Sequence, residues 1–218
     1  MKDILNKLSA HKTLSKEEAK NTLINISSGK YNSSHVTSFL TVYMMRNITV
    51  EELEGFRDAL MDLCLPVDLK DYNTIDLCGT GGDNKDTFNI STISAFVTAG
   101  AGIKVAKHGN YGVSSSCGSS NVLENLGVKF SNNQDFLKKC IEKSGICILH
   151  APLFHPAMKH VAPIRKELGL KTFFNMLGPI VNPSSPNNQM VGVFSLELAR
   201  LYSYLFQKSN KKFSIIHS

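Results

Sequence analysis

The 218-residue sequence predicts an α/β fold, with a small N-terminal all-helical domain and a mostly parallel-sheet domain that is incomplete at its C-terminus. Residues 1–66 carry apolar side chains at helical spacing and contain no strand-like run. From Thr74 onward, short apolar runs alternate with helical segments, which is typical of a parallel sheet. We expect a helical domain over 1–66, joined by helices from about 155–180, and an α/β domain over 74–218.

The helical domain is predicted from capping residues and apolar stripes. Ser15 followed by Glu18 forms the pattern of a capping box, and Thr49 can cap a later helix in the same way. The apolar positions that recur at helical spacing are Ile4, Leu5, Leu8, Val36, Phe39, Leu40, Tyr43, Met44, Leu60 and Leu63. Such stripes are expected to form a helical core, and their faces could also serve a dimer contact.

Pro66 ends these helices, and residues 68–73 form a polar linker to the second domain. Buried strands are expected at Thr74–Cys78, Ile103–Ala106, Ile146–His150, Gln189–Phe194 and Lys212–Ile216. Helices are expected at Ser94–Ala101, Gln134–Lys143, Pro163–Gly169 and Leu196–Phe206, the first of them apolar enough to be buried.

The composition excludes several classes of protein. A hydrophobic fraction of 42% is ordinary for a globular chain, and no apolar run is long enough for a membrane span. The net charge of +6 comes from lysines spread over the whole chain, so it gives no stripe for nucleic acid. The five cysteines contain no CxxC pair, and their odd number without a secretory signal favours a cytoplasmic protein with reduced thiols.

The first candidate binding element is Gly79-Thr80-Gly81-Gly82-Asp83, which follows a predicted strand. Glycines permit positive φ angles and close approach of the backbone to a ligand, but an ordinary tight turn needs the same residues. The loop has neither the Walker A ending nor dinucleotide spacing. Asn89-Ile90-Ser91-Thr92 comes next, before an apolar helix that Ser91 or Thr92 can cap. The free N–H groups of that helix start suit a phosphate, and a hydroxyl there can ligate Mg²⁺ on a diphosphate.

A second polar loop follows the next strand. Lys107-His108-Gly109-Asn110 offers a point charge to phosphate, and Ser114 to Ser120 add hydroxyls at another helix start. Two such loops in tandem predict a cradle for phosphate and pyrophosphate. His108 suits an orienting hydrogen-bond donor better than a catalytic base. Arg165 could grip a carboxylate, although an exposed position on a helix surface is the simpler interpretation of the sequence.

These motifs together resemble anthranilate phosphoribosyltransferases. The resemblance covers essentially the whole chain and is carried by GTGGD, TFNIST, KHGN with GVSS and GSS, and the stretch HPAMKHVAPIRKELGLKTFFNMLGP. It implies an Mg²⁺-dependent homodimer that dimerises through the helical domain, with a fold shared with pyrimidine nucleoside phosphorylases. The implied reaction transfers the phosphoribosyl group of phosphoribosyl pyrophosphate (PRPP) to the amine of anthranilate, in tryptophan biosynthesis.

The resemblance also implies roles for particular residues. Anthranilate would contact Gly79, Asn110 and Arg165, with Arg165 on its carboxylate and His108 near its ring, and Ser91 would ligate the metal. Lys107, His108 and Asn110 would position the substrates, and no residue stands out as a certain acid or base. The implied PRPP contacts are Gly79, Gly82, Asp83, Thr87, Asn89, Ile90, Ser91, Thr92, Lys107, His108, Gly109, Asn110, Tyr111, Gly112, Val113, Ser114, Ser115 and Ser119.

Two departures from the family pattern affect these expectations. Tyr111 stands in KHGNYG where many members carry arginine, which changes one contact on the phosphate side. The family also has an adjacent Asp-Glu pair, which holds magnesium, shortly after the strand that ends here at Ile216. Because the chain ends first, we expect a truncated form with little or no activity.

Two alternatives stay open. A pyrimidine nucleoside phosphorylase-like enzyme would share the fold and a glycine-rich phosphate loop, but KHGN and the HPAMKH stretch argue against it. A non-catalytic relative could bind nucleic acid through its basic surface. Its phosphate loops would then be degraded, whereas here they are intact apart from Tyr111.

Overall fold

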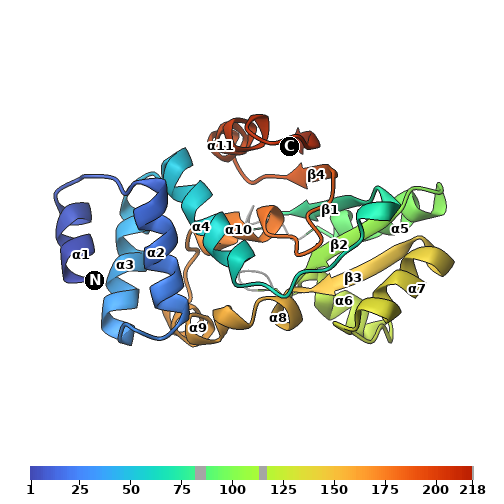
Figure 1. Ribbon diagram of the computed structural model, residues 1–218, viewed down its shortest axis with the longest axis horizontal. Coiled ribbons are helices and arrows are strands. Elements are labelled where there is room, and N and C mark those ends of the chain that lie inside the picture. Colours follow the sequence, from blue (N-terminus) through green and yellow to red (C-terminus); the bar gives the residue numbers. More distant parts are fainter. Residues whose placement is uncertain (82–86, 113–116, 218) are drawn as a thin grey trace.

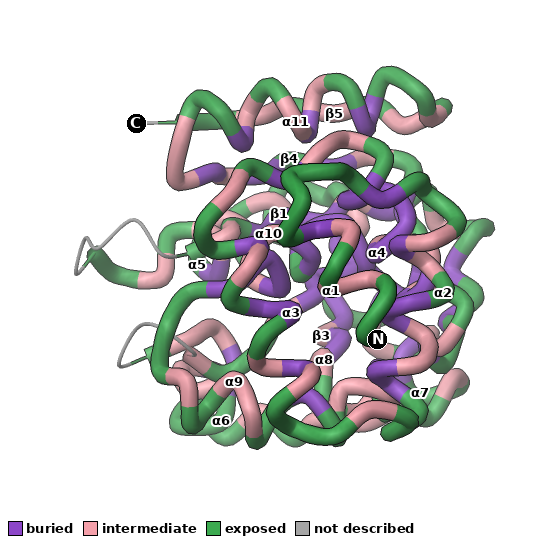
Figure 2. Tube along the Cα trace, turned by 90° about the vertical axis from the view of Figure 1, so that its left-hand side faces the viewer, coloured by how far each residue is buried: buried purple, intermediate pink, exposed green. Residues whose placement is uncertain are grey.

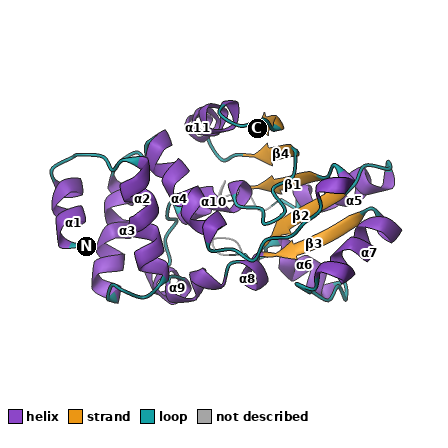
Figure 3. Ribbon diagram, in the orientation of Figure 1, coloured by secondary structure: helices purple, strands orange, loops and turns teal. Residues whose placement is uncertain are grey.

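The computed structural model describes residues 1–81, 87–112 and 117–217. The chain folds into an N-terminal helical part and an α/β part, as the sequence predicts (Figure 1). All strands of the described residues lie in the α/β part, at one end of the molecule, and helices make up the other end (Figure 3). Among the described residues, none of the helices is both long and apolar enough to cross a bilayer.

The helical part consists of α1 (Lys2–Ser9), α2 (Lys16–Ser27), α3 (Ser33–Met45) and α4 (Val50–Asp62). Both expected capping residues are confirmed. Ser15 and Thr49 each accept the N–H three residues on, and the Glu18 and Glu52 carboxylates accept the N–H of the cap in return. These boxes satisfy donors that a helix start would otherwise leave free, so they determine where α2 and α4 begin.

Aromatic rings form the centre of the helical core. Phe39 and Tyr43 of α3 and Phe56 of α4 contact Phe173, which precedes α10 (Phe174–Leu177). The rings of Phe56 and Phe173 are stacked with centroids 4.5 Å apart. The apolar stripe of α3 is therefore buried, and the segment around α10 packs into the same core.

The α/β part is built on a five-stranded sheet in the order β3-β2-β1-β4-β5, with every pair parallel. The strands are β1 (Ile75–Gly79), β2 (Val105–Gly109), β3 (Ile146–His150), β4 (Asn188–Gly192) and β5 (Lys212–Ile216). The two strands β3 and β5 match their expected bounds, and the others shift by one or more residues. The largest shift is in β2, which extends to Gly109 because it pairs with β3 along that length.

Helices cover the two faces of the sheet. The α/β helices are α5 (Ile90–Gly100), α6 (Ser119–Asn125), α7 (Gln134–Ser144), α8 (Ala151–Phe154), α9 (Ala162–Leu168), α10 and α11 (Leu196–Gln207), with short 3₁₀ turns η1 (Lys70–Tyr72), η2 (Pro156–His160) and η3 (Gly178–Ile180). Of these, α5 packs on β1 and β2, α7 packs on β3, and α11 lies between β5 and α4. Figure 2 shows that the outward face of α11 is exposed and that the face toward the rest of the molecule is buried.

The prediction of a buried helix over residues 94–101 is wrong in two respects. The helix α5 begins earlier, at Ile90, and buries only Thr92 and Ala95. Its Ile93 and Val97 side chains are exposed. Apolar composition by itself cannot say how many faces of a helix are covered, which depends on the elements packed around it.

Candidate functional site

The first glycine loop lies at the carboxyl edge of the sheet. Gly79 ends β1 beside Gly192 of β4, and the Thr80 N–H donates to the Gly192 carbonyl at 2.9 Å. Gly81 has φ of +62°, a left-handed conformation that favours glycine. Because β1 has β2 on one side and β4 on the other, this loop stands where the strand order reverses. Ligands of open α/β sheets bind outside the carboxyl ends of the strands at this switch point.

The two polar loops meet in space. The Asn89 side chain, before α5, donates from Nδ2 to the Gly118 carbonyl at 3.3 Å, and Gly118 precedes α6. Lys107 of β2 donates from Nζ to the Leu77 carbonyl at 2.7 Å and to Ser91 Oγ at 3.4 Å. These contacts place the segments that follow β1 and β2 side by side at the N-terminus of α5.

The start of α5 differs from the expected cap. The N-cap is Asn89, whose side chain makes no capping hydrogen bond, so the expectation that Ser91 or Thr92 caps this helix is wrong. The helix begins at Ile90, so both hydroxyls lie inside its first turn. Ser91 Oγ accepts from Lys107, and the buried Thr92 Oγ1 has no partner among the described residues. The Ile90 N–H donates to the Phe88 carbonyl and the Thr92 N–H to the Asn89 carbonyl, so in this first turn it is the Ser91 N–H that has no acceptor among the described residues. That N–H and the positive end of the helix dipole are available to a ligand.

Lys107 is a buried lysine, with 1% of its surface exposed. Burial lowers its pKa, and the nearby Asp76 carboxylate opposes that shift. Burial also raises the pKa of Asp76, which is fully buried on β1 and accepts the His108 N–H at 3.1 Å. The sequence placed Lys107 on a loop, whereas the structure places it within β2, beneath the start of α5. Its positive charge adds to that of the N-terminal end of α5, so an anion would be favoured at this position.

Two buried histidines face the same end of the sheet. His108 Nδ1 lies 3.0 Å from the Gly178 carbonyl, and His155 Nε2 lies 2.9 Å from the Val181 carbonyl. Because a carbonyl only accepts, these nitrogens carry the protons, and Nε2 of His108 is a buried acceptor without a partner among the described residues. Burial lowers both pKa values to about 4, so both rings are neutral at neutral pH.

Arg165 on α9 is half-buried and has no carboxylate partner among the described residues. Its Nη2 donates to Asn175 Oδ1 at 3.3 Å, its guanidinium lies 5.1 Å from the centre of the Phe174 ring, and its Nε is buried without a partner. Burial lowers its pKa to about 10. The simpler interpretation of the sequence, an exposed surface arginine, is therefore wrong. A buried guanidinium with free donors is a site for a carboxylate.

Most of the residues expected to bind substrate lie at the carboxyl edge of the sheet, and some fall outside the residues that the structure describes. Gly79, Thr87, Asn89, Ile90, Ser91 and Thr92 surround the start of α5, whereas Lys107, His108, Gly109, Asn110, Tyr111, Gly112 and Ser119 surround the end of β2. The residues outside the described ranges are Gly82, Asp83, Val113, Ser114 and Ser115. Arg165 is connected to the edge through Asn175 on α10 and the Gly178 turn, whose carbonyl accepts from His108.

Sequence reasoning missed several residues of this region. Asn175 and Phe174 hold Arg165, and Ser120 holds His150 at the end of β3 through a 2.8 Å contact from Oγ to Nδ1. The asparagine after a pair of phenylalanines in TFFNML was the one available signal, because amides rarely occupy apolar segments without a partner.

The described residues alone do not form a metal cage. Among them, no group of three or more His, Cys, Asp or Glu side chains is placed to hold a metal ion. Ser91 is a reasonable single ligand, since Mg²⁺ commonly takes one or two protein ligands and completes its shell with substrate phosphates and waters. Its hydroxyl lies beside the ammonium group of Lys107, so a cation would fit there only together with an anionic diphosphate.

Comparison with known proteins agrees with this architecture. Residues 2–64 match the helical bundle domain of the glycosyl transferase family, and residues 71–218 match its a/b domain. The chain is 73% identical over 218 residues to the anthranilate phosphoribosyltransferase of Flavobacterium psychrophilum, covering all of this chain and 66% of that protein. It thus spans about two thirds of the length of the relatives that it matches.

Solved structures show the same fold. The anthranilate phosphoribosyltransferase of Thermus thermophilus superposes with a TM-score of 0.89 at 34% identity, over 98% of this chain and 65% of that one. The Saccharomyces cerevisiae enzyme, in complex with PRPP and Mg, superposes with a TM-score of 0.87 at 32% identity, over 97% of this chain and 63% of that one. From its two family domains and its sheet topology, the chain belongs to the glycosyl transferase family that joins a helical bundle domain to an a/b domain.

Proposed function

We propose that this protein transfers the phosphoribosyl group of PRPP to the amine of anthranilate, giving N-(5-phosphoribosyl)anthranilate and pyrophosphate in tryptophan biosynthesis. The observation that carries the proposal is the hydrogen bond from Asn89 to Gly118, which joins the two polar loops at the start of α5. The relatives' shared name, anthranilate phosphoribosyltransferase, supports the choice of substrates.

The residue types suit this reaction. The bond from ribose C1 to the diphosphate oxygen breaks, a C–N bond forms, and the amine loses a proton. Positive charge develops on the sugar and negative charge on the leaving diphosphate. The first turn of α5 offers the Ser91 N–H and a positive dipole to that diphosphate, and Lys107 adds a charge beneath it. Mg²⁺, with Ser91 as a ligand, would supply further stabilisation of the leaving group.

The other substrate is expected at Arg165. Its donors would bind the carboxylate of anthranilate, and its contact with the Phe174 ring leaves the planar guanidinium fixed in orientation. His108 would accept a hydrogen bond at Nε2, the acceptor that faces no other group among the described residues. Neutral anthranilate amine can attack once it is aligned, so these residues act by positioning.

The remaining expectations belong to the same proposal. We propose PRPP contacts at the residues around the start of α5 and the end of β2, with Gly79 and Asn110 also reaching anthranilate. We also propose a homodimer through the helical domain, a cytoplasmic location, no nucleic-acid partner, and a division into domains at 1–66 and 74–218. The exposed Met45, at the end of α3, is available to a dimer contact.

A direct assay tests the reaction. We propose that this truncated form is weakly active or inactive, so incubation of the protein with PRPP, anthranilate and Mg²⁺ should yield at most a low level of phosphoribosylanthranilate, measured by mass spectrometry. Ser91→Ala should lower turnover about 10- to 100-fold, since it removes one group from the leaving diphosphate. The matched control is Ser34→Ala, an exposed serine on α3, which should leave turnover unchanged.

Other outcomes would separate the alternatives. Cleavage of a pyrimidine nucleoside by orthophosphate, without use of PRPP, would replace this proposal with a phosphorylase activity. Binding of nucleic acid whose affinity falls steeply with salt, without turnover of PRPP, would instead indicate the non-catalytic relative. Equal turnover by Ser91→Ala and the unsubstituted protein would remove Ser91 from the metal site.

A further inference from the structure

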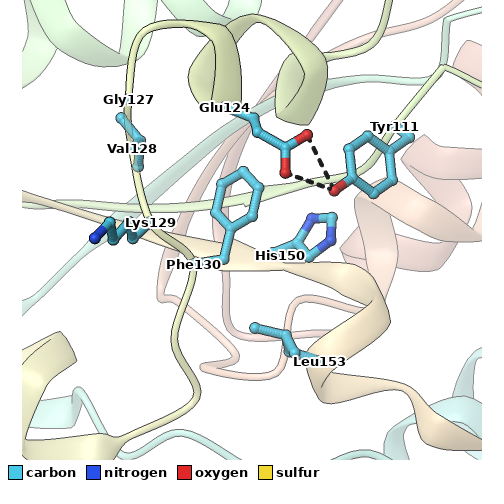
Figure 4. A pocket seen from close by; sticks show the side chains of 8 residues that line it. All are labelled: Tyr111, Glu124, Gly127, Val128, Lys129, Phe130, His150 and Leu153. Atoms are coloured by element: carbon cyan, nitrogen blue, oxygen red, sulfur yellow. Dashed lines mark hydrogen bonds between the residues drawn. The ribbon is translucent and has the colours of Figure 1, made fainter.

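A cluster of aromatic side chains lies between the second polar loop, which follows β2, and the end of β3. Tyr111, Phe130 and His150 surround a cavity of about 530 Å³, with Glu124 and Leu153 on its wall (Figure 4). The Phe130 ring stacks on His150 with centroids 4.3 Å apart, and the Tyr111 ring meets His150 edge-on at 4.8 Å. Of these residues, only Tyr111 has a part in the proposed chemistry, as one of the residues at the end of β2.

His150 is connected to the loop through one serine. Its Nδ1 lies 2.8 Å from Ser120 Oγ, and both residues are buried. The Ser120 N–H in turn donates to the Asn110 carbonyl at 3.1 Å, and Ser119 Oγ donates to the same carbonyl at 3.3 Å. The end of β3 therefore determines where the Asn110 backbone lies, through the first residues of α6.

The side chain of Asn110 has a defined orientation as a result. Its Oδ1 accepts the Tyr111 N–H at 2.8 Å, and its Nδ2 group has no acceptor among the described residues. Tyr111, the next residue, is held by Glu124 of α6, because its hydroxyl lies 3.3 Å from both oxygens of the Glu124 carboxylate. The cavity leaves one side of the Tyr111 ring uncovered, so the ring depends on Glu124 and His150 for its position.

Glycine packing keeps the same segment tight. A Cβ on Gly118 would lie 2.3 Å from the Gly112 nitrogen, and a Cβ on Gly109 would lie 2.5 Å from Ser119 Oγ. Asn121 Oδ1 also accepts both the Gly112 and the Gly118 N–H, at 3.0 and 2.9 Å. The segments on the two sides of this loop, 109–112 and 118–121, are therefore packed closely together, and a shift at Ser120 is passed on to Asn110.

We propose that His150 and Tyr111 are positioning residues, which set Asn110 and Ser119 for PRPP through the Ser120 contact and the Glu124 contact. This inference rests on the proposed function. Tyr111 stands where the family resemblance leads one to expect an arginine. In this inference it orients the segment at Asn110 through the contact of its ring with His150 and of its hydroxyl with Glu124. His150 does not touch substrate, whereas Tyr111 is also one of the residues proposed above to contact PRPP.

The test measures binding and kinetics of the same variants. His150→Phe keeps the ring stack with Phe130 and removes the bond to Ser120, and Ser120→Ala removes the same bond from the other side. Each should weaken the binding of PRPP with Mg²⁺, by calorimetry, about 3- to 10-fold, the usual effect of one hydrogen bond. The double variant should be no weaker than either single variant, because both remove one interaction.

Kinetics distinguish positioning from general loss of structure. In His150→Phe the KM for PRPP should rise while kcat and the thermal midpoint stay near those of the unsubstituted protein. Tyr111→Phe should show a smaller rise, and the matched control Tyr204→Phe, an exposed tyrosine on α11, should show none. His150→Asn, which keeps a side-chain partner for Ser120, should recover part of the affinity.

The outcomes separate this inference from the proposed function. If the unsubstituted protein binds no PRPP, the proposed function fails, and the inference fails with it. If it binds PRPP and the His150→Phe and Ser120→Ala variants bind equally well, the inference alone is overturned. Additive losses in the double variant would also overturn it, since the two side chains would then act separately.

Discussion

The rings of His108 and His155 lie with centroids 5.4 Å apart, and each ring donates to a different backbone carbonyl of the segment 178–181. Burial lowers the pKa of both rings to about 4 against the opposing effect of these hydrogen bonds, so both rings are neutral at neutral pH. The pair joins the end of β2 to the segment after β3, which places neutral acceptors beside the carboxyl edge of the sheet.

Acid should destabilise the protein through this pair. The folded-state pKa of each histidine is about 4, below the ordinary 6.5, so the unfolded state binds more protons as pH falls. Stability is present above pH 6.5 and is lost as pH falls toward about 4, by up to about 3 kcal/mol for each ring. Urea unfolding at pH 6.5 and 4.5 should show this slope.

Variants identify the histidines responsible. His155→Asn should reduce the loss of unfolding free energy between those two pH values, because asparagine does not titrate. The control His11→Asn changes an exposed histidine with φ of 57°, a conformation that asparagine tolerates, and should keep the full slope. An unchanged slope in His155→Asn would show that other groups cause the acid loss.

Replacement of Arg165 should affect one substrate. Lysine cannot form the paired hydrogen bonds of a guanidinium, so Arg165→Lys should raise the KM for anthranilate about 10-fold or more. The KM for PRPP should change little. Arg200→Lys, on the exposed face of α11, is the control. Equal increases in both KM values would place Arg165 outside the anthranilate site.

The helical part depends on one buried carboxylate. Glu52 is fully buried and accepts from the Leu14 N–H at 2.9 Å and the Tyr43 hydroxyl at 2.9 Å, and it pairs with Arg46. These bonds hold its pKa below the usual value against the opposing effect of burial. Glu52→Gln would leave the Arg46 charge without its partner, so unfolding free energy should fall by about 3–5 kcal/mol.

Denaturant titration of Glu52→Gln checks this value, and Glu51→Gln, an exposed neighbour on the same helix, should change stability by less than about 0.5 kcal/mol. A loss of the same size in both variants would mean that the helix start, and not the buried pair, determines the effect.

Close packing of α2 on α4 depends on Gly55. A Cβ there would lie 2.3 Å from the Lys16 carbonyl oxygen and 2.8 Å from the Ala19 Cβ, so the helices would have to separate. Gly55→Ala should lower the thermal midpoint and cost about 1–3 kcal/mol. Gly100→Ala, where a Cβ meets no atom within 4 Å, should be neutral or slightly stabilising. Equal behaviour of the two variants would contradict the packing argument.

The sequence by itself determined the order of the elements and the place of the two polar loops along the chain. Local signals suffice for these: Ser15 and Thr49 cap their helices, β3 and β5 match their expected bounds, and the glycine and asparagine loops follow β1 and β2 as expected. Such features depend on residues a few positions apart, so they can be recognised without knowledge of the rest of the chain.

Tertiary structure decided how those pieces act together. Only the fold buries Lys107 beneath α5, leaves Arg165 without a carboxylate among the described residues, and joins Asn89 to Gly118. It also places His150 behind the loop, through a serine thirty positions away. Burial and partnership of polar groups arise from segments distant in sequence, and these set the charge, the pKa and the orientation of a side chain. The charge and orientation of the side chains at the carboxyl edge of the sheet therefore depend on packing that cannot be read from a local sequence pattern.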